Sequence, residues 1–389
     1  MTGQRHSFGA PVLARIIRDK DQPPVAASSA RLRECGRRLT HIMPRTHNNL
    51  FEQITSFDNL WAAYLDARRG KRYRPEVAQF AANLEENLLS LHNHLTWGSW
   101  QPGRAREFRV FEPKQRDIQA PPFADRIVHH ALVRVVEPLF ERRFIHHSYA
   151  CRVGKGAQRA VHAVQAMIRA EQRRSAKPWI IKADIKSYFA SIRHDVLFDA
   201  VARVISCRPT IALWRRIARA YGHEAGIGLP VGALTSQLAA NVVLDQLDHA
   251  ITDHAGVGRY VRYMDDTVIV LPSKSAAQAV LATLEDEVTR LGLRLNPKTR
   301  IFPAQQGVDF CGYRAWATHI LPRKTNTRRA RRDFQRLQAA YAAGLVTLHQ
   351  VRDRLMSYLA YAKHCSAHAL TAGLLNDLVL TPSNSPYGA

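Results

Sequence analysis

Two adjacent carboxylates, Asp265 and Asp266, have the surroundings that metal-dependent chemistry needs. They end the tetrapeptide 263–266 (Tyr-Met-Asp-Asp), which separates two β-rich runs at 259–263 and 267–271. The pattern therefore predicts a hairpin with two carboxylates at its turn. Adjacent carboxylates repel one another, and a divalent cation relieves this repulsion when the pair is held at a sheet edge. A solvated Asp-Asp turn without a function is the alternative, because Asp is common in turns.

A third carboxylate, Asp184, follows a short apolar run at 179–183 that predicts a buried strand. Synthesis of a phosphodiester with two metal ions needs carboxylates from separate elements that converge on ions about 3.5–4 Å apart. We therefore predict that Asp184, Asp265 and the carbonyl of Ile185, supported by Asp266, bind two Mg²⁺ ions, with Mn²⁺ as an alternative metal. Taken alone, Asp184 could equally be a strand-end or helix-capping residue.

The elements that must position these acids follow from the apolar periodicity. Apolar residues at helical spacing begin near Phe57, and further helices are predicted at about 76–95, 194–206 and 276–291. A helical face at 128–139 is expected to close near Pro138. Strands are predicted at 107–111 and 117–120, joined by a turn at 113–116, and at 310–316.

The chain is strongly basic, which indicates a polyanionic partner. Its formal net charge is +24 and its pI is near 10.4, so nucleic acid is the first candidate and an anionic membrane surface the second. The five cysteines form no C-x-x-C pair, which argues against a disulfide framework or a zinc knuckle and suits a reducing cytoplasm. We expect no membrane span, since no run of 18 apolar residues occurs, and the N-terminus lacks the order of a signal peptide.

Two segments of the chain carry basic residues in patterns of their own. Residues 1–45 carry scattered Arg and Lys with weak periodicity and are interpreted as a basic arm, or as an extension without a role. Between 323 and 336, seven basic residues face the single acid Asp333, and apolar stripes follow at helical spacing. This segment predicts a small basic helical domain that contacts nucleic-acid phosphates without sequence preference.

Taken in order, these motifs resemble the palm of reverse transcriptases. In this family the strand Asp is followed five positions later by Phe, and Tyr-Met-Asp-Asp comes later in a hairpin. Further similar blocks are 112–116, 125–132, 228–237, 296–299 and 310–313. The resemblance implies an α+β right-hand polymerase with fingers, an antiparallel palm sheet with helices, and a small helical thumb. The corresponding domains are a basic arm at 1–45, fingers with part of the palm at 46–178, the palm at 179–316 and the thumb at 317–389.

The resemblance also implies roles for single residues. Lys114 and Arg116 would bind the triphosphate of an incoming deoxynucleotide, Phe189 would exclude a 2′-hydroxyl, and Lys298 would protonate the leaving pyrophosphate. An exposed basic hairpin, a core aromatic ring and an ordinary surface lysine are the respective alternatives. Val231 and Gly232 would lie near the nucleotide. Contacts with primer and template would come from Phe310, Gly312, Tyr313, Arg323, Lys324, Arg328 and Arg329.

The block at 228–237 also suggests a subtype. Val231-Gly232, the ending Ser236-Gln237 and the segment 146–156 resemble reverse transcriptases of diversity-generating retroelements. That subtype implies cDNA synthesis from a template RNA with errors at adenines, and a small basic accessory protein. Loss of packing at Val231 is one hypothesis for the low fidelity.

Four other functions stay open on the sequence. Two are reverse transcriptases of the group II intron or retron type, although an intron maturase is expected to carry a longer helical domain after the thumb. The third is an RNA-templated RNA polymerase, against which Phe189 argues. The fourth is a catalytically silent RNA-binding scaffold, which would predict a broken carboxylate set.

Overall fold

The computed structural model describes residues 46–111, 115–220 and 226–381. The predicted basic arm at 1–45 and the predicted triphosphate ligand Lys114 lie outside these residues. For Arg116 the backbone is described but the side chain is not.

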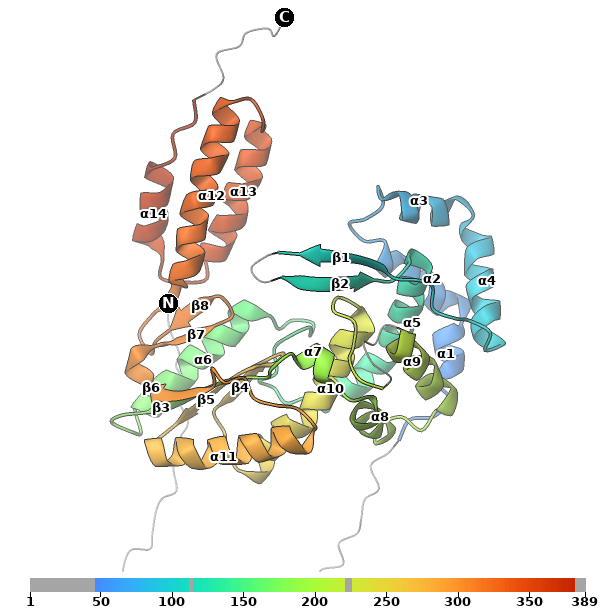
Figure 1. The fold of residues 1–389 in the computed structure, drawn as a ribbon, viewed down its shortest axis with the longest axis horizontal. Coiled ribbons are helices and arrows are strands. Elements are labelled where there is room, and N and C mark those ends of the chain that lie inside the picture. Colours follow the sequence, from blue (N-terminus) through green and yellow to red (C-terminus); the bar gives the residue numbers. More distant parts are fainter. Residues whose placement is uncertain (1–45, 112–114, 221–225, 382–389) are drawn as a thin grey trace, which may run out of the picture. The chain divides into compact units, whose positions relative to one another are not determined.

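The N-terminal part of the described chain is helical and carries one hairpin (Figure 1). Its elements are α1 Phe51–Thr55, α2 Phe57–Ala67, α3 Pro75–Ala82, α4 Leu84–Thr96, β1 Arg106–Val110, β2 Arg116–Ala120 and α5 Phe123–Glu141. Strands β1 and β2 pair antiparallel, with Phe108 opposite Ile118. This confirms the hairpin that alternation predicted.

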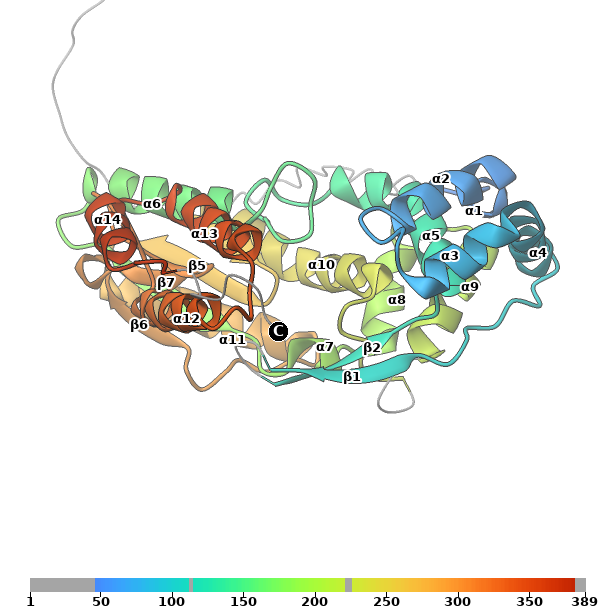
Figure 2. The ribbon, with the colours of Figure 1, turned by 90° about the horizontal axis from the view of Figure 1, so that it is seen from above.

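A four-stranded antiparallel sheet forms the centre of the structure. It contains β3 Trp179–Asp184, β4 Tyr260–Tyr263, β5 Asp266–Leu271 and β6 Arg300–Pro303, in the order β4-β5-β3-β6. Helices α6 Ala157–Gln172 and α11 Lys274–Arg290 cover its opposite faces (Figures 1 and 2). The side chains alternate accordingly: Ile180 and Val268 pack in the core with α6, whereas Ile181 and Ile269 pack in the core with α11.

Further helices lie between the strands in sequence. They are α7 Tyr188–Ser191, α8 His194–Ala202, α9 Arg208–Ala220 and α10 Leu234–His249, and α10 runs into a π-helical turn at Ala250–His254. A second sheet, β7 Val308–Phe310, β8 Tyr313–Ala315 and β9 Ile320–Pro322, leads into α12 Lys324–Ala342, α13 Leu348–Ala362 and α14 His368–Asn376. The predicted α+β fold is confirmed, and the basic segment at 323–336 is helical from Lys324 onward.

Three predicted helices differ from the structure. The helix expected at 76–95 is two helices, because Asn83 (φ −122°, ψ 53°) leaves the helical region between α3 and α4; Asn competes with the helix by bonding nearby backbone. Pro138 does not close α5, which continues to Glu141 with Phe140 buried, so core packing outweighs the hydrogen bond that proline removes. Helix α8 ends at Ala202 rather than 206.

None of the helices in the described part of the chain is long and apolar enough to cross a membrane.

Candidate active site

The strand register brings the predicted carboxylates together from two elements. Asp184 is the last residue of β3 and lies directly opposite Asp266, the first residue of β5. Residues opposite one another in an antiparallel pair project from the same face of the sheet. Just beyond this pair, the amide of Ile185 donates a hydrogen bond to the carbonyl of Asp265 at 3.3 Å. Residues far apart in sequence therefore form one acidic edge.

A tight turn presents Asp265 and Asp266 at this edge. Tyr263 of β4 pairs with Asp266 of β5, so only Met264 and Asp265 lie between the strands. Met264 has a φ of 56°, in the left-handed region that side chains other than Gly rarely adopt. Two-residue hairpin loops require positive φ in this position because their twist then matches that of the strands. The unfavourable backbone of Met264 is thus a consequence of the short turn.

Asn296 is a partner of Asp184 to which the sequence prediction assigned no role. Its side-chain Nδ2 donates to Asp184 Oδ2 at 2.8 Å, and its backbone amide donates to the Asp184 carbonyl at 2.7 Å. The amide of Lys298 donates to Asn296 Oδ1 at 3.1 Å. The loop with Lys298 is therefore attached to the acidic edge, while the Lys298 side chain itself is exposed. The Asn-Pro pair was the available signal, because it marks a turn.

Lys182 is a second residue that the sequence prediction missed. Two positions before Asp184, it projects from the same face of β3, and its amine forms an ion pair with Asp266. The side chain is only 18% exposed, and Nζ lies 4.9 Å from the centre of the Phe310 ring. Burial lowers the pKa of Lys182 to about 8, although Cys311, Asp184 and Asp265 act to raise it. A lysine inside an apolar strand was the available signal, since unpaired lysine is rarely buried.

The acidic edge has the donor chemistry that Mg²⁺ prefers, namely carboxylate and carbonyl oxygens. Within the described residues, however, no group of three or more His, Cys, Asp or Glu side chains is arranged to hold an ion. Instead Asp266 pairs with the Lys182 amine, and Asp184 and Asp265 act on the same amine electrostatically. The negative charge of this edge therefore attracts a cation, and the Lys182 amine already neutralises part of that charge.

Three of the predicted nucleotide-binding residues, Phe189, Val231 and Gly232, come from two segments that are joined by a hydrogen bond. The amide of Leu229 donates to the carbonyl of Phe189 at 2.8 Å, which joins the segment after β3 to the segment before α10. Gly232, with a φ of 103°, lies so near the fingers hairpin that a Cβ there would be 3.6 Å from Ile118 Cγ2. Val231 and Phe189 are both half-buried, and the Phe189 ring packs on Tyr188 with 5.7 Å between ring centres. Val231 and Gly232 thus lie between the palm and the β1–β2 hairpin.

Comparison with known proteins identifies the family. Residues 112–315, just over half of the 389-residue chain, match the family described as Reverse transcriptase (RNA-dependent DNA polymerase). The chain belongs to the reverse transcriptase family. It is an RNA-directed DNA polymerase, and the matched region contains Asp184, Asp265 and Asp266 together with their partners Lys182 and Asn296.

Curated relatives place this reverse transcriptase near the group II intron type. It is 28% identical over 60% of its length to Protein YkfC of Escherichia coli (strain K12), covering 72% of that protein. It is 24% identical to the Putative COX1/OXI3 intron 1 protein of Saccharomyces cerevisiae, covering 73% of this chain and 42% of the relative. The Group II intron-encoded protein LtrA of Lactococcus lactis is 24% identical over 42% of this chain and 28% of the relative. The chain thus spans less than half of the two intron proteins.

Among solved structures, the reverse transcriptase is similar to telomerase from Candida albicans in a complex with a fragment of telomeric RNA. The TM-score is 0.44 at 12% identity, over 71% of this chain and 55% of the other.

The predicted primer-contacting turn of the reverse transcriptase is attached to its thumb helices. The Gly312 carbonyl accepts hydrogen bonds from Tyr361 Oη at 2.5 Å, from Asn326 Nδ2 at 3.1 Å and from the amide of Arg323 at 3.1 Å. The rings of Phe310 and Tyr313 are each 1% exposed. These two rings therefore support the turn from the core, and the turn backbone at Gly312 is the part nearer the surface.

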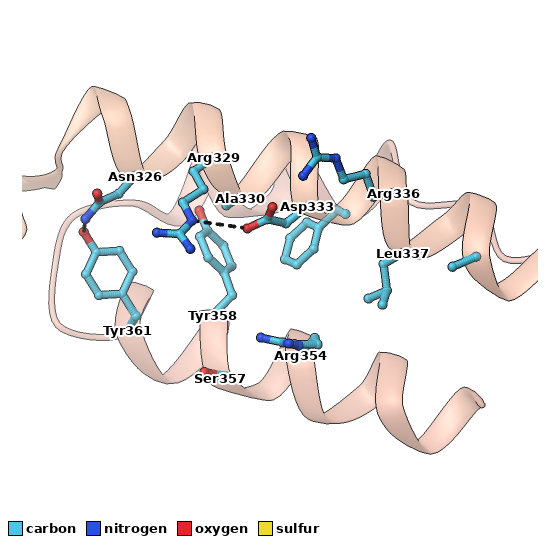
Figure 3. Close-up of a pocket in the computed structure, with 12 residues that line it drawn as sticks. Asn326, Arg329, Ala330, Asp333, Arg336, Leu337, Arg354, Ser357, Tyr358 and Tyr361 are labelled. Carbon is cyan, nitrogen blue, oxygen red and sulfur yellow. Dashed lines mark hydrogen bonds and ion pairs between the residues drawn. The ribbon is translucent and has the colours of Figure 1, made fainter. Parts of the chain in front are cut away.

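The thumb helices α12 and α13 enclose a groove of about 780 Å³ (Figure 3). Its lining includes the buried Phe334 and Tyr358 together with Arg329, Arg336 and Arg354. Arg329 forms an ion pair with Asp333 at 3.7 Å. Of the other predicted contacts, Lys324 and Arg328 are exposed on α12, and the exposed Arg323 pairs with Asp309 at 3.3 Å. The thumb therefore presents its positive charge on more than one side.

Proposed function

We propose that this reverse transcriptase copies a template RNA into cDNA by two-metal phosphoryl transfer at the edge where Asp184, Asp265 and Asp266 converge. The observation that carries the proposal is the register of Asp184 opposite Asp266, together with the hydrogen bond from Ile185 to the Asp265 carbonyl. Carboxylates from two separate elements then lie at one place, as this chemistry requires. A silent scaffold would have no need of this convergence.

The proposed cofactors are two Mg²⁺ ions, with Mn²⁺ as a substitute, which would increase the acidity of a hydroxyl and neutralise phosphate charge. Asp184, Asp265 and the Ile185 carbonyl are the proposed ligands, and Asp266 supports them. The hydrogen bond from Asn296 fixes Asp184 Oδ2, which directs the other carboxylate oxygen toward a ligand position. The Lys182 amine keeps Asp266 in place and reduces the net negative charge of the edge.

The remaining chain groups are proposed to bind deoxynucleoside triphosphates and nucleic acid. Lys114 and Arg116 would bind the triphosphate, and the half-buried Phe189 ring would exclude a 2′-hydroxyl. Lys298 would donate a proton to the leaving pyrophosphate; it is exposed on a loop that Asn296 attaches to the acidic edge. The Gly312 turn and the basic α12 would hold the primer and template.

We further propose that the enzyme is the error-prone polymerase of a diversity-generating retroelement. The support is the sequence 231–237, in which Val231 stands where intron and retroviral relatives have Gln. The smaller Val231 side chain would leave room for a mispaired nucleotide, and its neighbour Gly232 lies close to Ile118 of the β1–β2 hairpin. This subtype implies a small basic accessory protein as a partner.

The group II intron type is the second candidate, favoured by the intron-encoded relatives. The two candidates differ in fidelity. Primer extension by the full chain on an RNA template, with Mg²⁺ and four deoxynucleotides, followed by sequencing of the cDNA, separates them.

Errors concentrated opposite template adenines, reduced by Val231→Gln, support the diversity-generating type. Uniformly accurate cDNA overturns that subtype in favour of the intron type. If no cDNA forms even with the cognate RNA and a basic accessory protein, or if Asp265→Ala extends as well as wild type, the catalytic assignment itself fails.

A further inference from the structure

A buried arginine contacts the turn that carries Asp265 and Asp266. Arg262 of β4 pairs with Thr267 of β5 and lies one residue from Val261, which packs in the core with α6. Strand alternation therefore directs the Arg262 side chain toward α10, on the face opposite Asp184 and Asp266. The side chain is 0% exposed. The function proposed above gives no role to it.

The Arg262 guanidinium is fixed on α10 by a bidentate ion pair. Its Nε donates to Asp248 Oδ1 at 2.7 Å, and its Nη2 donates to Asp248 Oδ2 at 2.6 Å. Asp248 is likewise 0% exposed and accepts a further bond from the hydroxyl of Tyr260 at 2.7 Å. A fork-to-fork pair of this kind sets the plane of the guanidinium as well as its position.

The remaining amine of the fork contacts the turn itself. Arg262 Nη1 donates to the carbonyl of Met264 at 3.1 Å and to Asn241 Oδ1 at 3.1 Å. Asn241 is in turn anchored, because its Nδ2 donates to the carbonyl of Ala150 at 2.9 Å. The peptide that links Met264 to Asp265 is thus held by a chain of buried groups that begins on α10.

Stability alone does not account for this arrangement. A buried ion pair loses the hydration of both charges, and apolar residues of similar size are often as stabilising in such places. What the pair provides is direction: because Asp248 fixes the plane of the guanidinium, Nη1 is held where it donates to both Asn241 Oδ1 and the Met264 carbonyl. The left-handed φ of 56° that the short turn imposes on Met264 costs free energy for a residue other than Gly, and the bond from Arg262 to its carbonyl offsets part of this cost.

We propose that Arg262 is a positioning residue, which acts through the Met264 carbonyl to hold Asp265 and Asp266 in their reactive arrangement. Asp248 is its orienting partner on α10. The inference rests on the proposed function, in which these two carboxylates serve phosphoryl transfer. With Lys182 on one face of the sheet and Arg262 on the other, the turn is held from both sides.

The residue just before the same strand provides a matched control. Arg259, three residues before Arg262, forms an ion pair with Glu171 of α6 at 2.8 Å, with side-chain exposures of 25% and 4%. This pair lies at the opposite end of β4 from the turn. The double variants Arg262→Met/Asp248→Asn and Arg259→Met/Glu171→Gln each remove one such pair without leaving an isolated charge. Arg262→Lys is the milder variant, which keeps the charge but loses the fork.

The full chain and its variants would be compared by single-nucleotide primer extension, by affinity for primer–template, by thermal unfolding and by amide hydrogen exchange of peptide 260–268 without metal. We expect Arg262→Met/Asp248→Asn to lower kcat by about 100-fold, since displacement of reacting groups by about 1 Å has this effect. Affinity for primer–template should not change, and the turn amides should exchange faster. For Arg262→Lys, kcat and the exchange rate of the turn amides should lie between those of this double variant and wild type.

Equal losses of kcat in the two double variants at equal loss of thermal stability would overturn the proposal, as would unchanged exchange at the turn. If Arg262→Met/Asp248→Asn does not fold, Arg262→Lys decides by the same comparison with Arg259→Lys. Failure of the proposed function is recognised separately, because then wild type makes no cDNA or Asp265→Ala is fully active. The exchange measurement tests the contact with the turn in either case.

Discussion

Helices α10 and α12 are similar in length but have opposite surroundings. In α10 eleven of 16 residues are buried, including the polar Thr235, Asn241 and Asp248. In α12 only Phe334 of 19 residues is buried, and the helix is rich in arginine. The first helix orients groups inside the palm, whereas the second presents charge to a partner. A change in α10 should therefore affect the rate of chemistry, and a change in α12 should affect affinity and its dependence on salt.

The hydrogen bonds of the two regions agree with this division. Around the turn at Met264 and Asp265, the contacts of Arg262, Asp248 and Asn241 are buried. In the thumb, the ion pairs are partly exposed, as with Arg329 and Asp333 at 41% and 53% exposure. Exposed pairs contribute little to stability and are screened by salt. The thumb charges are thus available to phosphate groups.

Removal of a carboxylate from the acidic edge should have the largest effect on kcat. Asp265→Asn keeps the size of the side chain but removes its charge, and we expect a loss of kcat on the order of 1,000-fold. Primer–template affinity, measured by fluorescence anisotropy, should change less than about twofold, because phosphate contacts dominate binding. Asp286→Asn on the exposed side of α11 is the control. Loss of affinity without loss of kcat would contradict the division between palm and thumb.

Acid should destabilise the buried core through His129 of α5. Burial lowers the pKa of this imidazole to about 3, and Nδ1 lies 3.2 Å from Thr235 Oγ1 of α10. A histidine in the unfolded chain has a pKa of about 6.5. Below that pH the unfolded chain therefore binds more protons than the folded chain, and the free energy of unfolding falls as the pH is lowered to about 3. At pH 5 the loss due to His129 is about 2 kcal/mol relative to neutral pH.

Urea unfolding between pH 7 and pH 5 measures this effect. His129→Gln should reduce the change in the free energy of unfolding between pH 7 and pH 5 by about the same 2 kcal/mol. His368→Gln, on the exposed surface of α14, should leave this change as in wild type. An unaltered slope in His129→Gln would mean that other groups cause the acid sensitivity.

The sequence predicted the residues of the acidic edge better than the residues that hold this edge in place. Asp184, Asp265 and the hairpin at 263–266 could be located because strand periodicity and acidic type coincide at the same positions. Lys182, Asn296 and Arg262 were missed as partners, because their roles depend on which strands become neighbours. Sequence spacing does not encode that register. The helix end predicted near Pro138 was wrong for a related reason: α5 continues to Glu141 because it is packed in the core.

Lys182 provides a test of how the acidic edge binds cations. Its ammonium competes with any added cation at Asp266. Lys182→Met should therefore lower the Mg²⁺ concentration for half-maximal thermal stabilisation by about tenfold, which is within the energy of unit charges about 4 Å apart. Lys177→Met, an exposed lysine just before β3, should not shift the Mg²⁺ dependence. A higher Mg²⁺ requirement in Lys182→Met would show instead that the amine is needed to shape the binding edge.

The thumb should give the smallest effect per residue. Lys324 and Arg328 are exposed on α12, and their joint replacement by Ala should weaken primer–template binding a few-fold at about 0.1 M salt. The slope of log affinity against log salt should become shallower by about 0.7 to 0.9 for each lost phosphate contact, with kcat unchanged. Arg290→Ala, at the end of α11, is the control: it also removes a positive charge, but away from the thumb, and should leave the salt slope unchanged. An altered kcat with an unchanged salt slope would mean that α12 acts on the palm through the hydrogen bond from Asn326 to the Gly312 carbonyl. The palm and the thumb would then be mechanically coupled.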